Sequence, residues 1–114
     1  MTLSARNWAW AVNVVTIDGE KRSVLPAEKL VLLCIAELEN SDEGCAWPSQ
    51  KYIAERTGLS ERTVLTHVGT LTMLGAIEKR RHRSNRGRWD RNVYFLNVPQ
   101  KYRDSDPEWM SKQG

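Results

Sequence analysis

TGLSERTVLTHV, residues 57–68, combines a turn signal with the beginning of a helix. Gly58 tolerates the left-handed backbone that a sharp turn requires. Ser60 is a residue type that caps helix N-termini, and Val64 and Val68 follow it at helical spacing. We therefore predict a helix-turn-helix, in which one helix ends at Gly58 and the next begins after Ser60 and ends at Gly75.

The sequence before this stretch predicts two further helical segments. In WPSQKYIAERT, Ser49 can cap a short helix whose inner face carries Ile53 and Ala54. Upstream, Pro26 suits the first turn of a helix, where its missing N–H costs nothing. Residues 31–36 of that helix are all apolar, so we expect it to be covered on most sides as the central core helix.

After the predicted third helix, AIEKRRHR (76–83) and RNVYFLNV (91–98) are strand-like, and SNRGRWD (84–90) between them is typical of a hairpin loop. Alternation in the second piece allows one face to be buried. The order is helix, helix, turn, helix, strand, basic loop, strand. The predicted fold class is mainly α with a small antiparallel β-hairpin, a winged helix-turn-helix.

WPSQKYIAERTGLSERTV followed by LGAIEKRR resembles the winged-helix domains of phage and plasmid replication proteins and of GntR-type repressors. LPAEKLVLLCIAELENSDEGCAWPS is similar to the helix and loop that precede this motif in the phage and plasmid group. The resemblance covers about residues 25–98 and implies DNA binding. It places Gln50 and Lys51 at positions that commonly contact phosphates. It also shows a departure, because Leu65 and Thr66 stand where relatives often carry basic residues.

Residues 25–98 are therefore expected to form the DNA-binding domain. The structure of residues 1–24 is left open, since Trp8 and Trp10 alternate as in a strand while Ala9 and Ala11 suit a helix. Residues 99–114 form a polar tail, either loose or held to the body or to a second subunit by Trp109. The acidic residues of the loops and tail are expected to be solvated: Asp42, Glu43, Asp104, Asp106 and Glu108.

The charge of the chain is unevenly distributed. Its 114 residues fit one domain and carry a net charge of +3. Between Lys79 and Arg91, however, there are seven basic residues and one acidic residue, a local charge of +6 that leaves −3 for the rest of the chain. A concentrated cationic segment attracts polyanions through its local potential, so double-stranded DNA is the expected partner.

Other chemistries find little support in the sequence. Cys34, Cys45, His67 and His82 lack metal-ligand spacing, so the cysteines are expected to be reduced thiols and no metal or cofactor is predicted. No nucleophile–base set or phosphate-binding glycine loop is apparent, so an enzyme is not expected. With no signal peptide and no long apolar run, the expected location is cytoplasmic, with no membrane partner.

The predicted DNA contacts fall into three groups. Arg62 matches the acceptors of guanine, Leu65 can pack on a thymine methyl, and Glu61 either accepts from cytosine or complements the helix N-terminus. Gly69 permits close approach of a backbone. In the recognition helix, which begins after Ser60, the predicted contacts are Ser60, Glu61, Arg62, Leu65 and Thr66. In the bracing helix, which ends at Gly58, they are Ser49, Gln50 and Lys51. In the wing, which is the basic hairpin, they are Arg81, Arg83, Arg86, Arg88 and Arg91.

Several alternatives stay open at this level. The DNA-binding role is either transcriptional regulation or replication initiation of a mobile element. A rival is a winged-helix module that docks on a replication or transcription protein through Leu65, Gly69 and the apolar flank of the first helix. A homodimer is also considered, with Trp8 and Trp10, or Trp109, at the interface; the alternative is that these tryptophans fill the core of the monomer.

Overall fold

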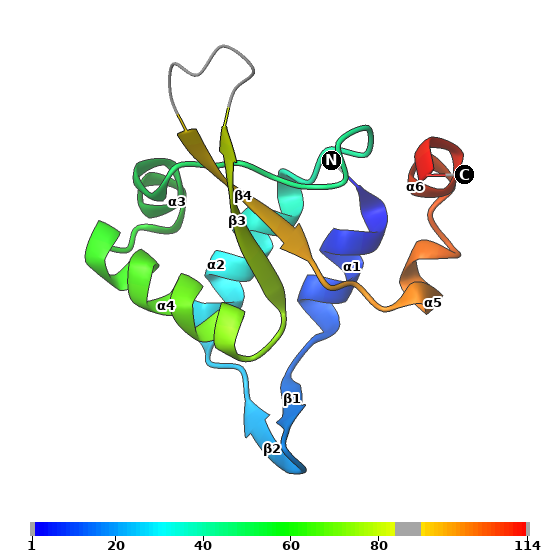
Figure 1. Cartoon of the computed structure of the whole chain (residues 1–114). Helices are drawn as coiled ribbons and strands as arrows, with labels where there is room; N and C mark the ends of the chain where they lie inside the picture. The colour runs from blue at the N-terminus through cyan, green and yellow to red at the C-terminus, as the bar shows by residue number, and fades with distance from the viewer. Residues whose placement is uncertain (1, 84–89, 114) are drawn as a thin grey trace.

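The computed structural model describes residues 2–83 and 90–113 of the chain. Figure 1 shows α1, α3 and α4 around α2, α5 and α6 beyond α1, and one β-hairpin at each end of the molecule. The elements in chain order are α1 (Leu3–Ala11), β1 (Val14–Ile17), β2 (Glu20–Ser23), α2 (Pro26–Glu37), α3 (Gln50–Thr57), α4 (Glu61–Met73), β3 (Ile77–Arg83), β4 (Asp90–Leu96), α5 (Gln100–Arg103) and α6 (Pro107–Gln113). Strand β1 pairs with β2 and β3 with β4, both antiparallel.

Helix α2 is the core helix, as predicted. Val31, Leu32 and Ile35 are fully buried, and α1, α3 and α4 all pack against this helix. Its N-terminus is satisfied by Glu28, whose carboxylate accepts the N–H of Leu25 at 2.9 Å. Because three helices pack around α2, it fixes the position of the two helices that follow it in the chain.

The helix-turn-helix forms as the sequence predicts. Ser49 caps α3, and its Oγ accepts the N–H of Tyr52 at 3.0 Å. Gly58 ends α3 with φ of 79°, a left-handed conformation that costs glycine little. Ser60 then caps α4 through the N–H of Thr63. Two caps and one glycine thus set the angle between α3 and α4.

The second hairpin is the wing, and its base is part of the core. Ile77, Tyr94 and Leu96 are buried, so the wing is anchored in the body at the end where it leaves α4. The loop before α3 adds a short third pairing, because Ala46 and Tyr94 exchange backbone hydrogen bonds of 2.9 and 2.7 Å. Cys45, in this same loop, is therefore buried beside the sheet.

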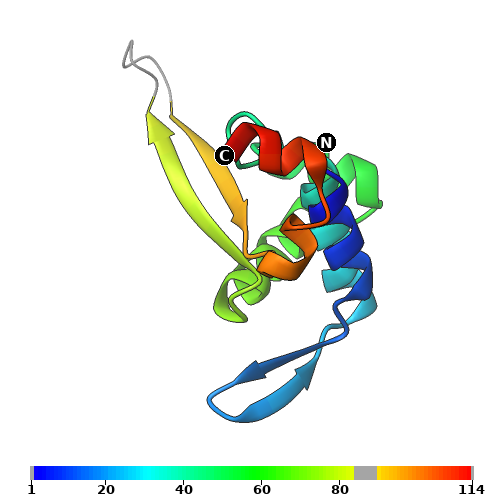
Figure 2. The ribbon, with the colours of Figure 1, turned by 90° about the vertical axis from the view of Figure 1, so that its right-hand side faces the viewer.

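The N-terminal segment resolves the ambiguity of its sequence. Residues 3–11 are helical and bury Ala5, Trp8 and Ala9 against the core, while Trp10 is 63% exposed. Trp8 thus fills the core of the monomer, and its suggested role at a dimer interface is wrong. Residues 14–23 then form the β1–β2 hairpin, which projects from the body in Figure 2.

The tail is not loose, because a buried polar cluster joins it to the N-terminus and to the end of α2. Arg103 donates to both Glu39 oxygens at 2.6 and 2.8 Å, and its guanidinium lies 3.5 Å from the ring centroid of Trp109. Trp109 therefore holds the tail to the body. We call this group the terminal cluster, and its residues are Thr2, Ser4, Glu39, Arg103 and Asp106.

The prediction that Asp106 is solvated is wrong, since it is 1% exposed. Its carboxylate accepts the N–H of Ser4 at 2.9 Å, the hydroxyl of Ser4, and the N–H of Trp109 at 3.2 Å. Burial favours the neutral acid, but these hydrogen bonds and the charge of Arg103 outweigh it and lower the pKa of Asp106. A carboxylate with this many donors stays ionised inside the protein.

Candidate nucleic-acid interface

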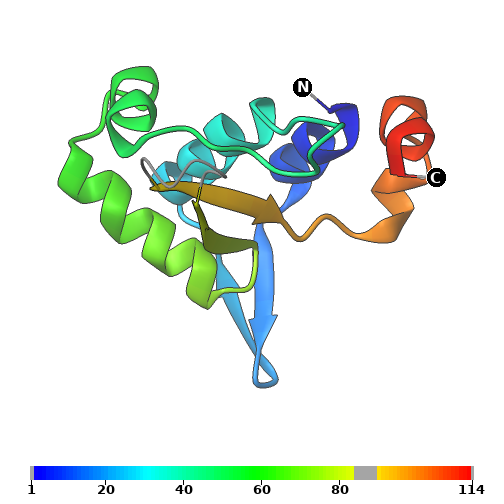
Figure 3. The same ribbon diagram turned by 45° about the horizontal axis from the view of Figure 1, so that its top comes forward.

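Helix α4 has one buried and one exposed face, as the helical spacing predicted. Val64, Val68 and Leu71 are buried toward the core. On the opposite face Arg62 is exposed and Leu65 is 48% exposed. Figure 3 shows this helix lying beside the β3–β4 hairpin, with α3 at its N-terminal end. Helix α4 and the hairpin are therefore neighbours in space, as a shared ligand would require.

The polar side chains on α4 are partly engaged by the helix itself. The hydroxyl of Ser60 accepts from the N–H of Thr63 at 3.1 Å and donates to its Oγ1 at 2.8 Å. Thr66 donates its hydroxyl to the carbonyl of Arg62 at 3.1 Å. Of the residues of this helix predicted to contact DNA, Arg62 and Leu65 thus have the side chains that the helix itself engages least. Glu61 is exposed in the first turn, where its charge complements the helix N-terminus.

Gly69 has no packing explanation inside the described chain. It lies on the exposed face of α4, and a Cβ built on it would meet no atom within 4 Å. Glycine in a helix costs about 1 kcal/mol relative to alanine. Within the described residues, no neighbour therefore requires glycine at this position.

The predicted bracing residues gather at the N-terminus of α3. Lys51 is exposed, Gln50 is half-buried, and Ser49 is occupied as the helix cap. A hollow of about 430 Å³ adjoins this end of the helix. Its lining residues are Leu38, Trp47, Pro48, Ser49 and Tyr52.

The arginines of the wing occupy different environments. The guanidinium of Arg91 lies 4.5 Å from the ring centroid of Trp47, a cation–π contact. Arg80 lies over Phe95 and forms a 2.8 Å ion pair with Glu78, which offsets its charge. The contact between Trp47 and Arg91 has no signal in the sequence, because it depends on the bridge that brings the loop before α3 onto β4.

Of the remaining predicted wing residues, Arg81 and Arg83 lie within the described part of the chain. Arg81 lies on β3 and is exposed. Arg83 is the last residue of β3, opposite Asp90. Arg86 and Arg88, also predicted for the wing, and Trp89 of the same loop lie outside the described residues.

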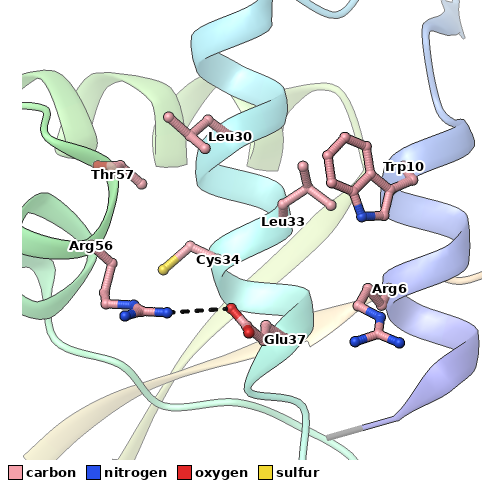
Figure 4. A pocket seen from close by; sticks show the side chains of 8 residues that line it. All are labelled: Arg6, Trp10, Leu30, Leu33, Cys34, Glu37, Arg56 and Thr57. Atoms are coloured by element: carbon pink, nitrogen blue, oxygen red, sulfur yellow. Dashed lines mark ion pairs between the residues drawn. The ribbon is translucent and has the colours of Figure 1, made fainter.

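A second hollow lies between α1, α2 and α3 (Figure 4). Its volume is about 240 Å³, and Arg56 and Glu37 face each other across one end at 3.9 Å. Burial raises the pKa of the Cys34 thiol there, which favours the neutral thiol over the reactive thiolate. The lining residues are Arg6, Trp10, Leu30, Leu33, Cys34, Glu37, Arg56 and Thr57.

Comparison with known proteins agrees with this architecture. Residues 25–77 match a family model described as a helix-turn-helix domain. A solved structure described as a possible transcriptional regulator from Methanosarcina mazei Go1 superposes with a TM-score of 0.50 over 82% of each chain. The fold is a winged helix-turn-helix. At 12% identity the likeness to that structure is one of fold.

A search among curated proteins finds no match. In residues 2–83 and 90–113 no helix is both long and apolar enough to cross a membrane. The match at residues 25–77 includes α2, α3 and α4 and ends where β3 begins. The helix-turn-helix therefore carries the family match, while most of the β3–β4 hairpin, α1, the β1–β2 hairpin and the tail lie outside the matched residues.

Proposed function

We propose that this protein binds double-stranded DNA, with α4 in the major groove and the β3–β4 wing on the adjacent minor groove or backbone. The observation that supports this most is the position of α4, with its exposed face, beside a hairpin whose residues 79–91 carry seven basic residues and one acidic residue. The major groove is wide enough to admit a helix. The process served is transcriptional regulation or replication initiation of a mobile element.

Affinity and sequence preference come from different parts of this surface. Lysine and arginine contacts to phosphates dominate affinity and make it salt-dependent. Lys51 and the wing arginines suit that role. Arg62 suits a base contact because its forked donors match O6 and N7 of guanine, and Leu65 suits the methyl group of thymine. The helix thus supplies a few contacts and the wing much of the attraction.

The test is duplex binding after selection of preferred sites from a random library. Replacing Arg83, Arg86 and Arg88 together by glutamine should weaken duplex binding. It should also make the fall of the log binding constant with log salt shallower, by about 0.9 for each phosphate that is no longer neutralised. A charge-matched control replaces Lys21, Lys101 and Lys112, which lie on β2, α5 and α6. Equal weakening in both triple variants would mean that net charge, not the wing, attracts DNA.

Arg62→Ala separates base reading from phosphate binding. It should cost about 1–3 kcal/mol on the selected site and little on random duplex. A similar cost on both duplexes would assign Arg62 to the backbone instead.

A second candidate function is docking on a replication or transcription protein, because Leu65 is 48% exposed in the middle of the free face of α4. Selection of preferred sites from the same random duplex library distinguishes DNA binding from docking on a protein. If no duplex is enriched and the wing variant behaves as the wild type, DNA binding is overturned and the docking function is favoured.

A further inference from the structure

The β1–β2 hairpin projects from the body at the end opposite to the wing (Figures 1 and 2). Within the described residues its strands pair only with each other. Arg22 ties it to α2 through hydrogen bonds of 3.2 and 3.0 Å to the carboxylate of Glu28. An isolated two-stranded hairpin is at best marginally stable in water. Beyond its base, the hairpin therefore gains little support from the fold of one chain.

One edge of the hairpin can be identified from its hydrogen bonds. Val24 donates its N–H to the carbonyl of Asn13 at 2.8 Å, so these two residues form a hydrogen-bonded pair. Val15, two residues after Asn13, lies opposite Arg22 and belongs to the next hydrogen-bonded pair. Hydrogen-bonded and non-hydrogen-bonded pairs alternate in antiparallel strands. The backbone N–H and C=O groups of Val14 and Thr16 therefore point away from β2, along the outer edge of β1.

The two edges differ in how they are protected. Strand β2 has the sequence EKRS, and charged side chains are a common means of preventing further pairing at a sheet edge. Strand β1 has the sequence VVTI, without charge and entirely β-branched, which favours strand pairing. Val14 is 51% exposed. The open edge is therefore that of β1.

We propose that β1 pairs antiparallel with β1 of a second copy of this chain. Placing Val14 opposite Thr16 of the second copy uses the outward N–H and C=O groups of both residues on both strands. Val15 then faces Val15 of the second copy across the twofold axis as a non-hydrogen-bonded pair. The two hairpins become one four-stranded sheet, which exceeds the three strands from which sheets gain independent stability.

The charges of the hairpin favour a second copy over a nucleic acid. Asp18 and Glu20 lie at its tip with Lys21, and the guanidinium of Arg22 is held by Glu28. No excess positive charge is available on this hairpin for a polyanion. A strand without charged side chains meets no repulsion when it pairs with itself, so β1 is self-complementary.

The dimer deepens the proposed function, since it would bring two copies of α4 to one duplex, as helix-turn-helix dimers do on two half-sites. Its interface lies at the end of the molecule opposite to the wing (Figure 1). Pairing is measured without DNA. A dimer that binds no duplex would overturn the DNA function alone, and a monomer that binds duplex would overturn the pairing alone.

Two proline variants form a matched test, because Thr16 and Lys21 are cross-strand partners whose N–H groups point to opposite edges. Thr16→Pro should weaken the dimer about tenfold or more in sedimentation equilibrium, since it removes an edge donor and breaks the strand. Lys21→Pro disturbs the hairpin equally but leaves the β1 edge intact, and should change dimerisation by less than about threefold. A wild-type monomer, or two proline variants that dimerise like the wild type, would overturn the pairing.

Cross-linking decides the case in which both proline variants are monomeric. A non-hydrogen-bonded pair places its Cα atoms about 4.5 Å apart, within the range that a disulfide spans. Val15→Cys should therefore form a disulfide-linked dimer under mild oxidation, whereas Ser23→Cys, on β2, should not. The native Cys34 and Cys45 are buried and do not compete. Failure of Val15→Cys to cross-link, or equal cross-linking of both variants, would overturn the proposed register.

Discussion

Arginine has two opposite roles in this molecule. In the terminal cluster Arg103 is 5% exposed, with its guanidinium between Trp109 and the carboxylate of Glu39. On the side proposed to face DNA, Arg62 is exposed, and Arg91 is only half-buried against Trp47. The first kind of arginine holds the chain's two ends together. The second kind leaves charge available to a partner.

The difference shows that the role of a charged residue cannot be predicted from its charge alone. Arg103 contacts Glu39 across 64 residues and Ser4 across 99 residues of sequence, so no local pattern marks them as partners. The wing arginines, in contrast, are recognisable because they are clustered with a single acidic residue among them. Substitutions in the two regions should therefore separate folding stability from DNA affinity.

The largest effect is expected for Arg103→Ala. It leaves the fully buried carboxylate of Glu39 without its cation, and breaking a buried ion pair costs about 3–5 kcal/mol. Urea unfolding should show this destabilisation, while the exposed Lys101→Ala on the same helix should change stability by less than about 0.5 kcal/mol. A cost below about 1 kcal/mol for Arg103→Ala would show that the terminal cluster contributes little to folding.

A smaller effect, dependent on pH, is expected for Asp106→Asn. The folded-state pKa of Asp106 lies below its ordinary value of 3.8. Its stabilisation is therefore complete above that value and is lost as the pH falls through the folded-state pKa. The variant should lose about 1–3 kcal/mol at pH 7 and lose less further stability than the wild type below about pH 4. Parallel acid-unfolding curves would contradict the role given to this carboxylate.

On the wing, Arg80 and Arg91 form a matched pair, since Arg80 lies opposite Val93 and Arg91 opposite His82 in the same two strands. Arg80 is already paired with Glu78. Arg91→Gln should therefore cost about 1–2 kcal/mol of duplex affinity and lower the salt slope by about 1. Arg80→Gln should do little, and equal effects would mean that the ion pair with Glu78 opens on binding.

Much of the fold could be predicted because its signals are local. Caps at Ser49 and Ser60, the turn glycine Gly58 and the periodicity of α2 and α4 each depend on residues a few positions apart. The burial of Asp106 and the contact of Trp47 with Arg91 could not, because they depend on how distant segments meet. The same holds for α1, whose helix is stabilised by packing of its buried face against α2 rather than by its own pattern.

The smallest effect tests the exposed face of α4 most directly. Gly69→Ala should stabilise the protein by about 1 kcal/mol, because alanine favours helix and its Cβ meets no atom within 4 Å. Met73→Ala, also exposed on α4, is the control and should change neither stability nor affinity much. If a DNA backbone approaches Gly69, the added methyl group will weaken duplex binding in a protein that has become more stable. A gain in stability with unchanged affinity would place the contact elsewhere on α4, since the methyl group would then point into solvent in the complex as well.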